Sequence, residues 1–294
     1  MLLLTPETKD KNSRMNARRE KDMNVSEAQK LLRESASDLR SGCDGGNLES
    51  GFWYFGLEPG GVNQFNLEPE KNAVDAVIRE EEREEWIGDN PYGRYFNQFF
   101  RAFFNLKTMT GRNSVKDSCN THFLLTDNGP AFKGNIYPIS RQGHNQWNNL
   151  DIFFEEKVLG KAPEITGWTL DEFRENMIQV RKNVLLEKLE EINHKKGGKQ
   201  TIVVCTATGQ RNHFADILGV DAATFEEVPF ENSKGGSAYL SPIHGKSVKL
   251  IGWLYVIPFF RGPRGSLKYQ EQRDYAVKLR EILIGKGANI TLSC

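Results

Sequence analysis

The sequence lacks any pair of cysteines at the C-x-x-C spacing that zinc and iron–sulfur sites use. Its four cysteines stand far apart, at Cys43, Cys119, Cys205 and Cys294, and its five histidines show no metal-ligand spacing. We therefore predict free thiols, with Cys205 in a buried strand, and a function that needs no metal and no other cofactor.

A long hydrophobic run is also missing, so no segment is predicted to span a bilayer as a helix. The opening Met1-Leu2-Leu3-Leu4 is too short for the apolar part of a signal peptide, and a charged stretch follows it. These absences favour a cytoplasmic protein with no membrane partner.

An excess of charge of one sign is absent too, because 39 basic residues balance 39 acidic ones. A neutral chain is unlike a protein that coats nucleic acid through its overall charge. Locally the balance breaks: residues 68–89 hold nine acidic and three basic residues, whereas residues 246–280 hold eight basic and two acidic ones. The basic stretch could engage phosphates within a neutral molecule. The alternative is that both stretches are solvated helix faces, and we prefer it for the acidic one.

The remaining composition is that of an ordinary globular protein, with 38% hydrophobic and 27% charged residues. Short apolar runs typical of strands alternate with amphipathic segments typical of helices. The predicted strands lie at residues 52–55, 131–139, 201–205 and 248–259. The predicted helices lie at 25–39, 69–86, 92–106, 169–194 and 269–284, with a short one ending at Leu218. This alternation predicts an α/β fold with a mostly parallel sheet flanked by helices.

The beginning of the chain differs from the rest in composition. Residues 1–24 are polar and charged and are predicted to be disordered, and a short amphipathic helix and a glycine-rich loop follow them. We therefore predict a peripheral segment over residues 1–47 and a single α/β domain over 48–294.

The most informative motif is Gly56-Leu57-Glu58-Pro59-Gly60-Gly61, directly after the first predicted strand. Gly56, Gly60 and Gly61 permit close approach of a ligand, and Pro59 makes the turn rigid. Glu58 would then be a fixed carboxylate that can position or deprotonate a water molecule. The alternative is a plain tight turn with an exposed glutamate.

Three more segments follow predicted strands, and ligands of parallel sheets bind at the carboxyl ends of the strands. Asn135 offers a donor and an acceptor together, which match one edge of a base, unless it only caps a turn. The segment Gly209–His213 opens a helix that could bind phosphate, although it lacks a full P-loop pattern. Residues 259–266 interleave aromatic residues, arginine and glycine, which suits stacking and phosphate contact, unless they form a bare surface loop. We expect the four loops to form one cleft.

Three of these motifs together resemble the uracil-DNA glycosylase superfamily. Gly56-Leu57-Glu58-Pro59-Gly60 is similar to its G-x-N-P-G turn, and Asn135-Ile136-Tyr137-Pro138 is similar to the N-x-x-P strand end of the single-strand-selective branch. Arg261-Gly262-Pro263-Arg264-Gly265 stands where that branch has a P-S-P-R-N loop. The resemblance covers roughly Gly51 to Gly285 and implies a three-layer α/β/α fold.

The resemblance implies excision of a deaminated or modified base that is flipped out of DNA into the cleft. Glu58 would orient the water, Phe65 would stack on the base, and Asn135 would read its pairing edge. The loop Pro263-Arg264-Gly265 would press on the DNA strand. The rest of the substrate pocket would be formed by Gly56, Pro59, Gly60 and Gly61.

Two departures from the family pattern keep other functions open. Glu58 stands where the family usually has Asp or Asn, and Phe260 stands where it has a late histidine. Phe260 cannot donate a hydrogen bond to a departing base, which favours an inactive module that binds nucleic acid or a modified nucleotide, for instance in phage defence. A third hypothesis is an unrelated α/β enzyme that acts on a small phosphorylated substrate through the Gly209 turn.

Overall fold

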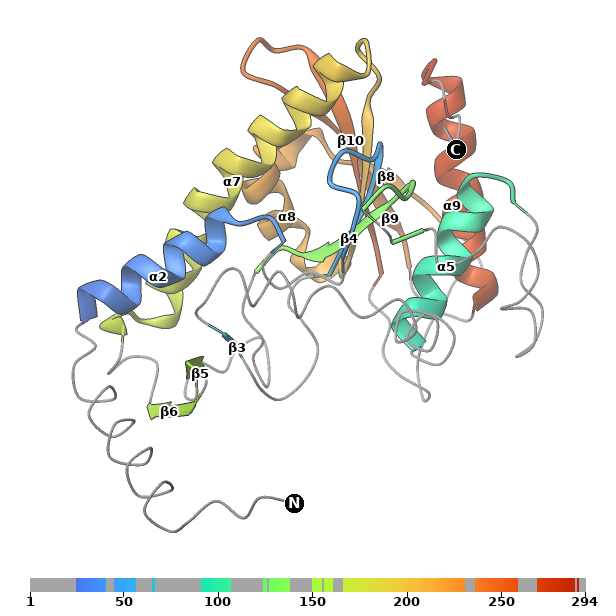
Figure 1. Cartoon of the computed structure of the whole chain (residues 1–294). Coiled ribbons are helices and arrows are strands. Elements are labelled where there is room, and N and C mark those ends of the chain that lie inside the picture. Colours follow the sequence, from blue (N-terminus) through green and yellow to red (C-terminus); the bar gives the residue numbers. More distant parts are fainter. Residues whose placement is uncertain are drawn as a thin grey trace.

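A computed structural model of the chain describes residues 25–40, 45–56, 65–66, 91–106, 124–125, 127–137, 150–154, 156–160, 166–230, 236–258, 269–288 and 290 (Figure 1). The segment predicted to be disordered, residues 1–24, and the acidic helix predicted over 69–86 lie outside these residues.

The centre of the fold is a seven-stranded mixed sheet in the order β1-β4-β2-β7-β10-β9-β8. Its strands are β1 (Gly45–Gly46), β2 (Phe52–Gly56), β4 (Phe132–Asn135), β7 (Thr201–Thr206), β8 (Glu226–Val228), β9 (Ala238–His244) and β10 (Leu250–Ile257). The four neighbours β4, β2, β7 and β10 run parallel, whereas β1, β9 and β8 pair antiparallel at the two edges. A small second sheet contains β3 (Phe65–Asn66), β5 (Leu150–Phe154) and β6 (Glu156–Gly160). The α/β class is therefore confirmed.

Five α-helices accompany the sheet in the described part of the chain. They are α2 (Val25–Ser37), α5 (Pro91–Phe103), α7 (Leu170–Lys195), α8 (Arg211–Leu218) and α9 (Tyr269–Gly285). Each lies where the sequence predicts a helix. The start of α7 is fixed by a capping box, because the Thr169 hydroxyl accepts a hydrogen bond from the Glu172 N–H while the Glu172 carboxylate accepts one from the Thr169 N–H. Its end is followed by Gly197 and Gly198, both with positive φ angles.

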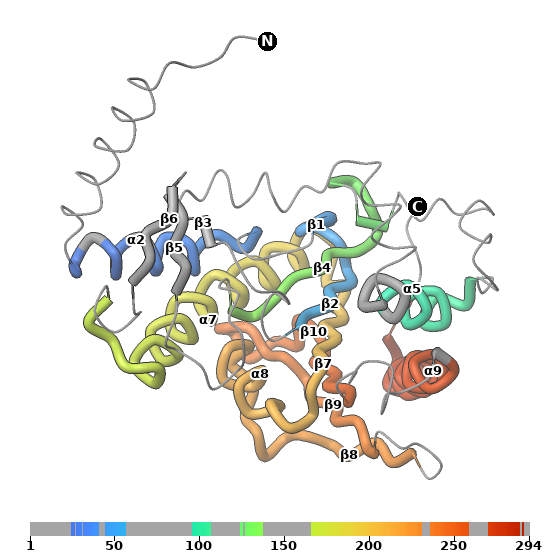
Figure 2. Tube along the Cα trace, turned by 90° about the horizontal axis from the view of Figure 1, so that it is seen from below, coloured from blue at the N-terminus to red at the C-terminus, as the bar shows by residue number. Residues whose placement is uncertain are grey.

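The strands bury side chains on both faces of the sheet. On β2, Phe52 and Tyr54 belong to one core cluster, and Trp53 and Phe55 belong to another. The first cluster contains buried residues of α5 and α9, and the second contains those of α2, α7 and α8. Figure 2 shows these two groups of helices on opposite sides of the strands. The phenylalanines of α5 therefore belong to the core.

The residues before position 47 contribute to this core and sheet. Leu32 and Ala36 of α2 are fully buried in the same cluster as α7, and β1 pairs with β4. The sequence predicts a loop at β1 because of its two glycines. The structure shows that the glycines instead allow close pairing with the neighbouring chain, which leaves no room for a side chain. A Cβ on Gly46 would lie 2.4 Å from the carbonyl oxygen of Ala131.

Gly252 marks a similarly close approach between β10 and β7. A Cβ on Gly252 would lie 2.6 Å from the carbonyl oxygen of Thr201, its partner on β7. We expect Gly252→Ala to lower the free energy of unfolding by about 1–3 kcal/mol, because the strands must separate to admit the methyl group. Urea denaturation measures the loss. The control is Gly209→Ala, where a Cβ would meet nothing within 4 Å, so equal midpoints for the two variants would contradict the prediction.

Val248 lies in the turn between β9 and β10 with a φ of 61° and a side chain that is 80% exposed. A β-branched residue in this left-handed region is strained by about 1–3 kcal/mol, and the exposed side chain contributes little burial. Val248→Gly is therefore expected to raise the free energy of unfolding by about 1 kcal/mol. Thermal unfolding tests this against Val277→Gly on α9, which should lower stability because its backbone is helical.

Candidate functional site

The carboxyl ends of four strands meet at one edge of the sheet, as the sequence predicts. Because β4, β2, β7 and β10 are parallel, Asn135 at the end of β4 pairs with Gly56 at the end of β2. On the other side, Thr206 of β7 pairs with Ile257 of β10. The four segments singled out in the sequence therefore leave the sheet side by side. We call this row of strand ends the carboxyl edge.

The first described helices after β2 and after β7 lie on opposite faces of the sheet. The first described helix after β2 is α5, in one core cluster, whereas β7 is followed by α8, in the other. Such a switch point opens a crevice beyond the strand ends and is where open α/β sheets bind ligands. Gly56 stands on one side of this point, and Thr206 stands on the other.

The turn after β7 is strained at Ala207. Its φ of 114° is unusual for a residue with a Cβ. Hydrogen bonds hold it there, since its N–H donates to the Ile257 carbonyl over 2.9 Å and its own carbonyl accepts from the Gln210 N–H over 2.8 Å. Stored strain of this kind clusters at functional sites. Sequence reasoning missed Ala207, because an alanine carries no chemical signal.

Polar side chains behind this edge link β4 to α8. Asn135 is only 6% exposed, and the Tyr137 hydroxyl lies 3.3 Å from His213 Nδ1. Burial raises the pKa of Tyr137 to about 12, against the opposing effect of Arg174, so its hydroxyl stays protonated at neutral pH. His213 is half-buried in this contact.

Arg211 begins α8, within the segment Gly209–His213 that the sequence offers as a phosphate site. Its guanidinium lies 4.8 Å from the centroid of the Tyr239 ring on β9. Gly209 in the preceding turn is exposed and faces open space. The guanidinium is thus engaged with an aromatic face, which weakens the hypothesis of a phosphate site at the Gly209 turn.

Most of the residues assigned to the glycosylase motifs lie outside the described residues. These are Glu58, Pro59, Gly60 and Gly61, the loop Pro263-Arg264-Gly265, and Phe260. Phe65 is described only by its backbone in β3. Gly56 and Asn135 are described, and the sheet brings them together.

Cys205 is confirmed as a buried strand residue with a free thiol. Burial raises the pKa of this thiol well above its usual value, so it is not a nucleophile at neutral pH. Among the described residues, no three His, Cys, Asp or Glu side chains gather where they could hold a metal ion. None of the described helices combines the length and the apolar character needed to cross a membrane.

Comparison of the chain with protein-family models, with curated proteins and with solved structures found no match.

Proposed function

We propose that the carboxyl edge is the active site of a cytoplasmic DNA glycosylase that flips and excises a deaminated or modified base. The fold in this proposal is the three-layer α/β/α arrangement of the uracil-DNA glycosylases. The observation that carries it is the pairing of Gly56 with Asn135. The turn that begins at Gly56 and the strand end that bears the amide leave the sheet as neighbours, as one pocket for a single base requires.

The proposed reaction is hydrolysis of the N-glycosidic bond. Asn135 pairs with the edge of the flipped base, and its burial makes that hydrogen bonding selective. Glu58 accepts a proton from a water molecule whose oxygen bonds to C1′ of the sugar. The C1′–N bond breaks, and the base leaves with the bonding electrons and takes up a proton. Phe65 stacks on the base, and the Pro263-Arg264-Gly265 loop presses on the DNA strand.

The test is release of free base from single- and double-stranded oligonucleotides that carry uracil, hypoxanthine or an oxidised pyrimidine. Release of one of these bases is the expected result. No release of any base by a protein with a cooperative unfolding transition would overturn the proposed activity.

A binding module is the second candidate, and Phe260 in the place of the family's histidine favours it. Such a module would bind single-stranded DNA without releasing a base. Base release separates these two candidates, and DNA binding measured at several salt concentrations separates both from a small-molecule enzyme, because contacts to phosphates weaken steeply as salt rises. An enzyme for a small phosphorylated substrate would show no DNA binding at any salt concentration.

A further inference from the structure

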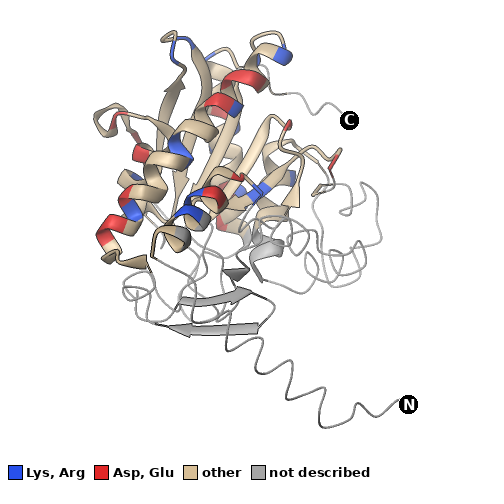
Figure 3. Cartoon of the chain, turned by 60° about the vertical axis from the view of Figure 1, so that its left-hand side comes forward, with Lys and Arg blue, Asp and Glu red and all other residues tan. Residues whose placement is uncertain are grey.

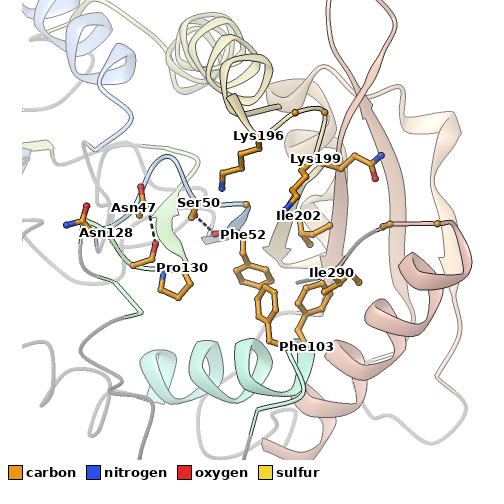
Figure 4. Close-up of a pocket in the computed structure, with 18 residues that line it drawn as sticks. Asn47, Ser50, Phe52, Phe103, Asn128, Pro130, Lys196, Lys199, Ile202 and Ile290 are labelled. Atoms are coloured by element: carbon orange, nitrogen blue, oxygen red, sulfur yellow. Dashed lines mark hydrogen bonds between the residues drawn. The ribbon is translucent and has the colours of Figure 1, made fainter. Parts of the chain in front are cut away.

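A cavity of about 450 Å³ lies at the opposite edge of the sheet, beside the amino ends of β2 and β7 (Figure 4). We call it the amino-edge cavity. Phe52 and Ile202 at the strand starts line it, together with the turn 196–200 after α7 and the end of α5. Its volume falls within the range of pockets for small molecules. It is separate from the carboxyl edge, where β2 and β7 end.

Two lysines, Lys196 and Lys199, line the cavity from the turn that follows α7. Within the described part of the chain, neither ammonium group has a hydrogen-bond or ion-pair partner. Two lysines of α7 differ in this respect. Lys188 and Lys195 both form ion pairs with Glu191, at 3.0 Å for Lys188. Figure 3 shows acidic and basic residues interspersed along the ribbon of the helices.

Lys196 is half-buried, and burial lowers the pKa of its ammonium group. Glu49 favours the charged form, whereas nearby Lys199 opposes it. A partly desolvated cation without a partner is unfavourable unless an anion joins it. The pair of lysines is thus suited to a ligand with negative charge.

Three other polar side chains of the cavity already have hydrogen-bond partners within the protein. The Asn47 amide donates to the Gly129 carbonyl over 3.0 Å and accepts from the Glu49 N–H over 2.8 Å. The Ser50 hydroxyl donates to the Phe52 carbonyl, and the Gln200 side chain accepts from the Trp253 indole. These groups offer a ligand little further hydrogen bonding.

The wall of the cavity near α5 is aromatic. Phe104 is half-buried there, and its ring centroid lies 4.9 Å from that of Phe103, whereas Phe103 and Phe52 are fully buried. Ile202 and Ile290 extend this apolar surface. Apolar walls with a few charged groups are typical of pockets for small organic ligands.

We propose that the amino-edge cavity binds a small organic anion, with a flat apolar body against the half-buried ring of Phe104 and a phosphate or carboxylate head between Lys196 and Lys199. The site is independent of the carboxyl edge, so the test of this proposal does not depend on whether the protein excises bases.

Isothermal titration calorimetry with 1-naphthyl phosphate tests this site. Inorganic phosphate and 1-naphthol each carry one half of the proposed ligand, and 1-naphthoic acid replaces the phosphate head with a carboxylate. We expect naphthyl phosphate or naphthoic acid to bind at least tenfold more tightly than phosphate or naphthol. No saturable binding of either anion, or equal binding of naphthol, would refute the site.

The decisive variant is Lys196→Met, which keeps the aliphatic stem and removes the charge. It should weaken binding of the aromatic anion at least tenfold, whereas Lys196→Arg should keep most of the affinity. Lys278→Met, on the exposed face of α9, is the matched control and should bind as the unchanged protein does. Thermal unfolding verifies that each variant is folded, and unchanged binding by folded Lys196→Met would overturn the proposal.

Discussion

Glu58→Ala is expected to reduce base release from a susceptible oligonucleotide by roughly 10²–10⁴-fold and to leave DNA binding largely intact. In the proposed reaction the carboxylate takes a proton from the attacking water and faces the positive charge that develops on the sugar. Neither role contributes to binding of the unreacted strand. Single-turnover release and equilibrium binding, measured on the same oligonucleotide, therefore separate the two effects.

Two further variants make the result specific to Glu58. Glu58→Gln keeps the size of the side chain but cannot accept the proton, so it should lose as much activity as the alanine variant. Glu175→Ala removes an exposed carboxylate from α7 and should release base at the unchanged rate. Undiminished release by Glu58→Ala would show that another group activates the water.

Phe52→Ala is expected to lower the free energy of unfolding by about 3–5 kcal/mol. Phe52 is fully buried, and its ring packs against those of Phe99, Phe100 and Phe103, with centroids 6.2, 5.2 and 5.4 Å away. Alanine would leave a cavity between β2 and α5, because aromatic neighbours held by other contacts cannot collapse into the space.

Urea denaturation measures this loss, and Phe52→Leu is the graded control because it retains most of the apolar volume. The leucine variant should lose about 1.5 kcal/mol or less. A loss below about 1 kcal/mol for Phe52→Ala would contradict the packing described for this cluster.

The elements with strong local signals could be predicted from the sequence. Thr169 and Glu172 indicate the start of α7, and the apolar runs of β2, β7 and β10 predict buried strands. β8 and β9 were missed because their signals are weak. β8 holds two exposed glutamates, and β9 contains Pro242. Such strands form because β9 can pair with β10 and β8 can pair with β9, which no local pattern encodes.

The features of the candidate site also differ in whether the sequence could predict them. That Gly56 and Asn135 meet follows from the rule for parallel strands, and the pairing of β2 with β4 confirms it. Ala207 and Lys196 carry no local signal, because the strain of the first and the burial of the second depend on surrounding elements. The roles assigned to Glu58 and to the Pro263-Arg264-Gly265 loop stay predictions.

The burial of β2 on both faces has a consequence for how the chain avoids misfolding. In a strand with one solvated face, a slip of one residue exposes its apolar side chains and is penalised for that reason. A slip of Phe52-Trp53-Tyr54-Phe55 by one residue would still bury an aromatic ring at three of the four positions. Misaligned strands must then be disfavoured by close backbone contacts that leave no room for a side chain. Gly252 against Thr201 is such a contact, because a shift of β10 by one residue would bring the side chain of Ile251 or Trp253 against the backbone of β7.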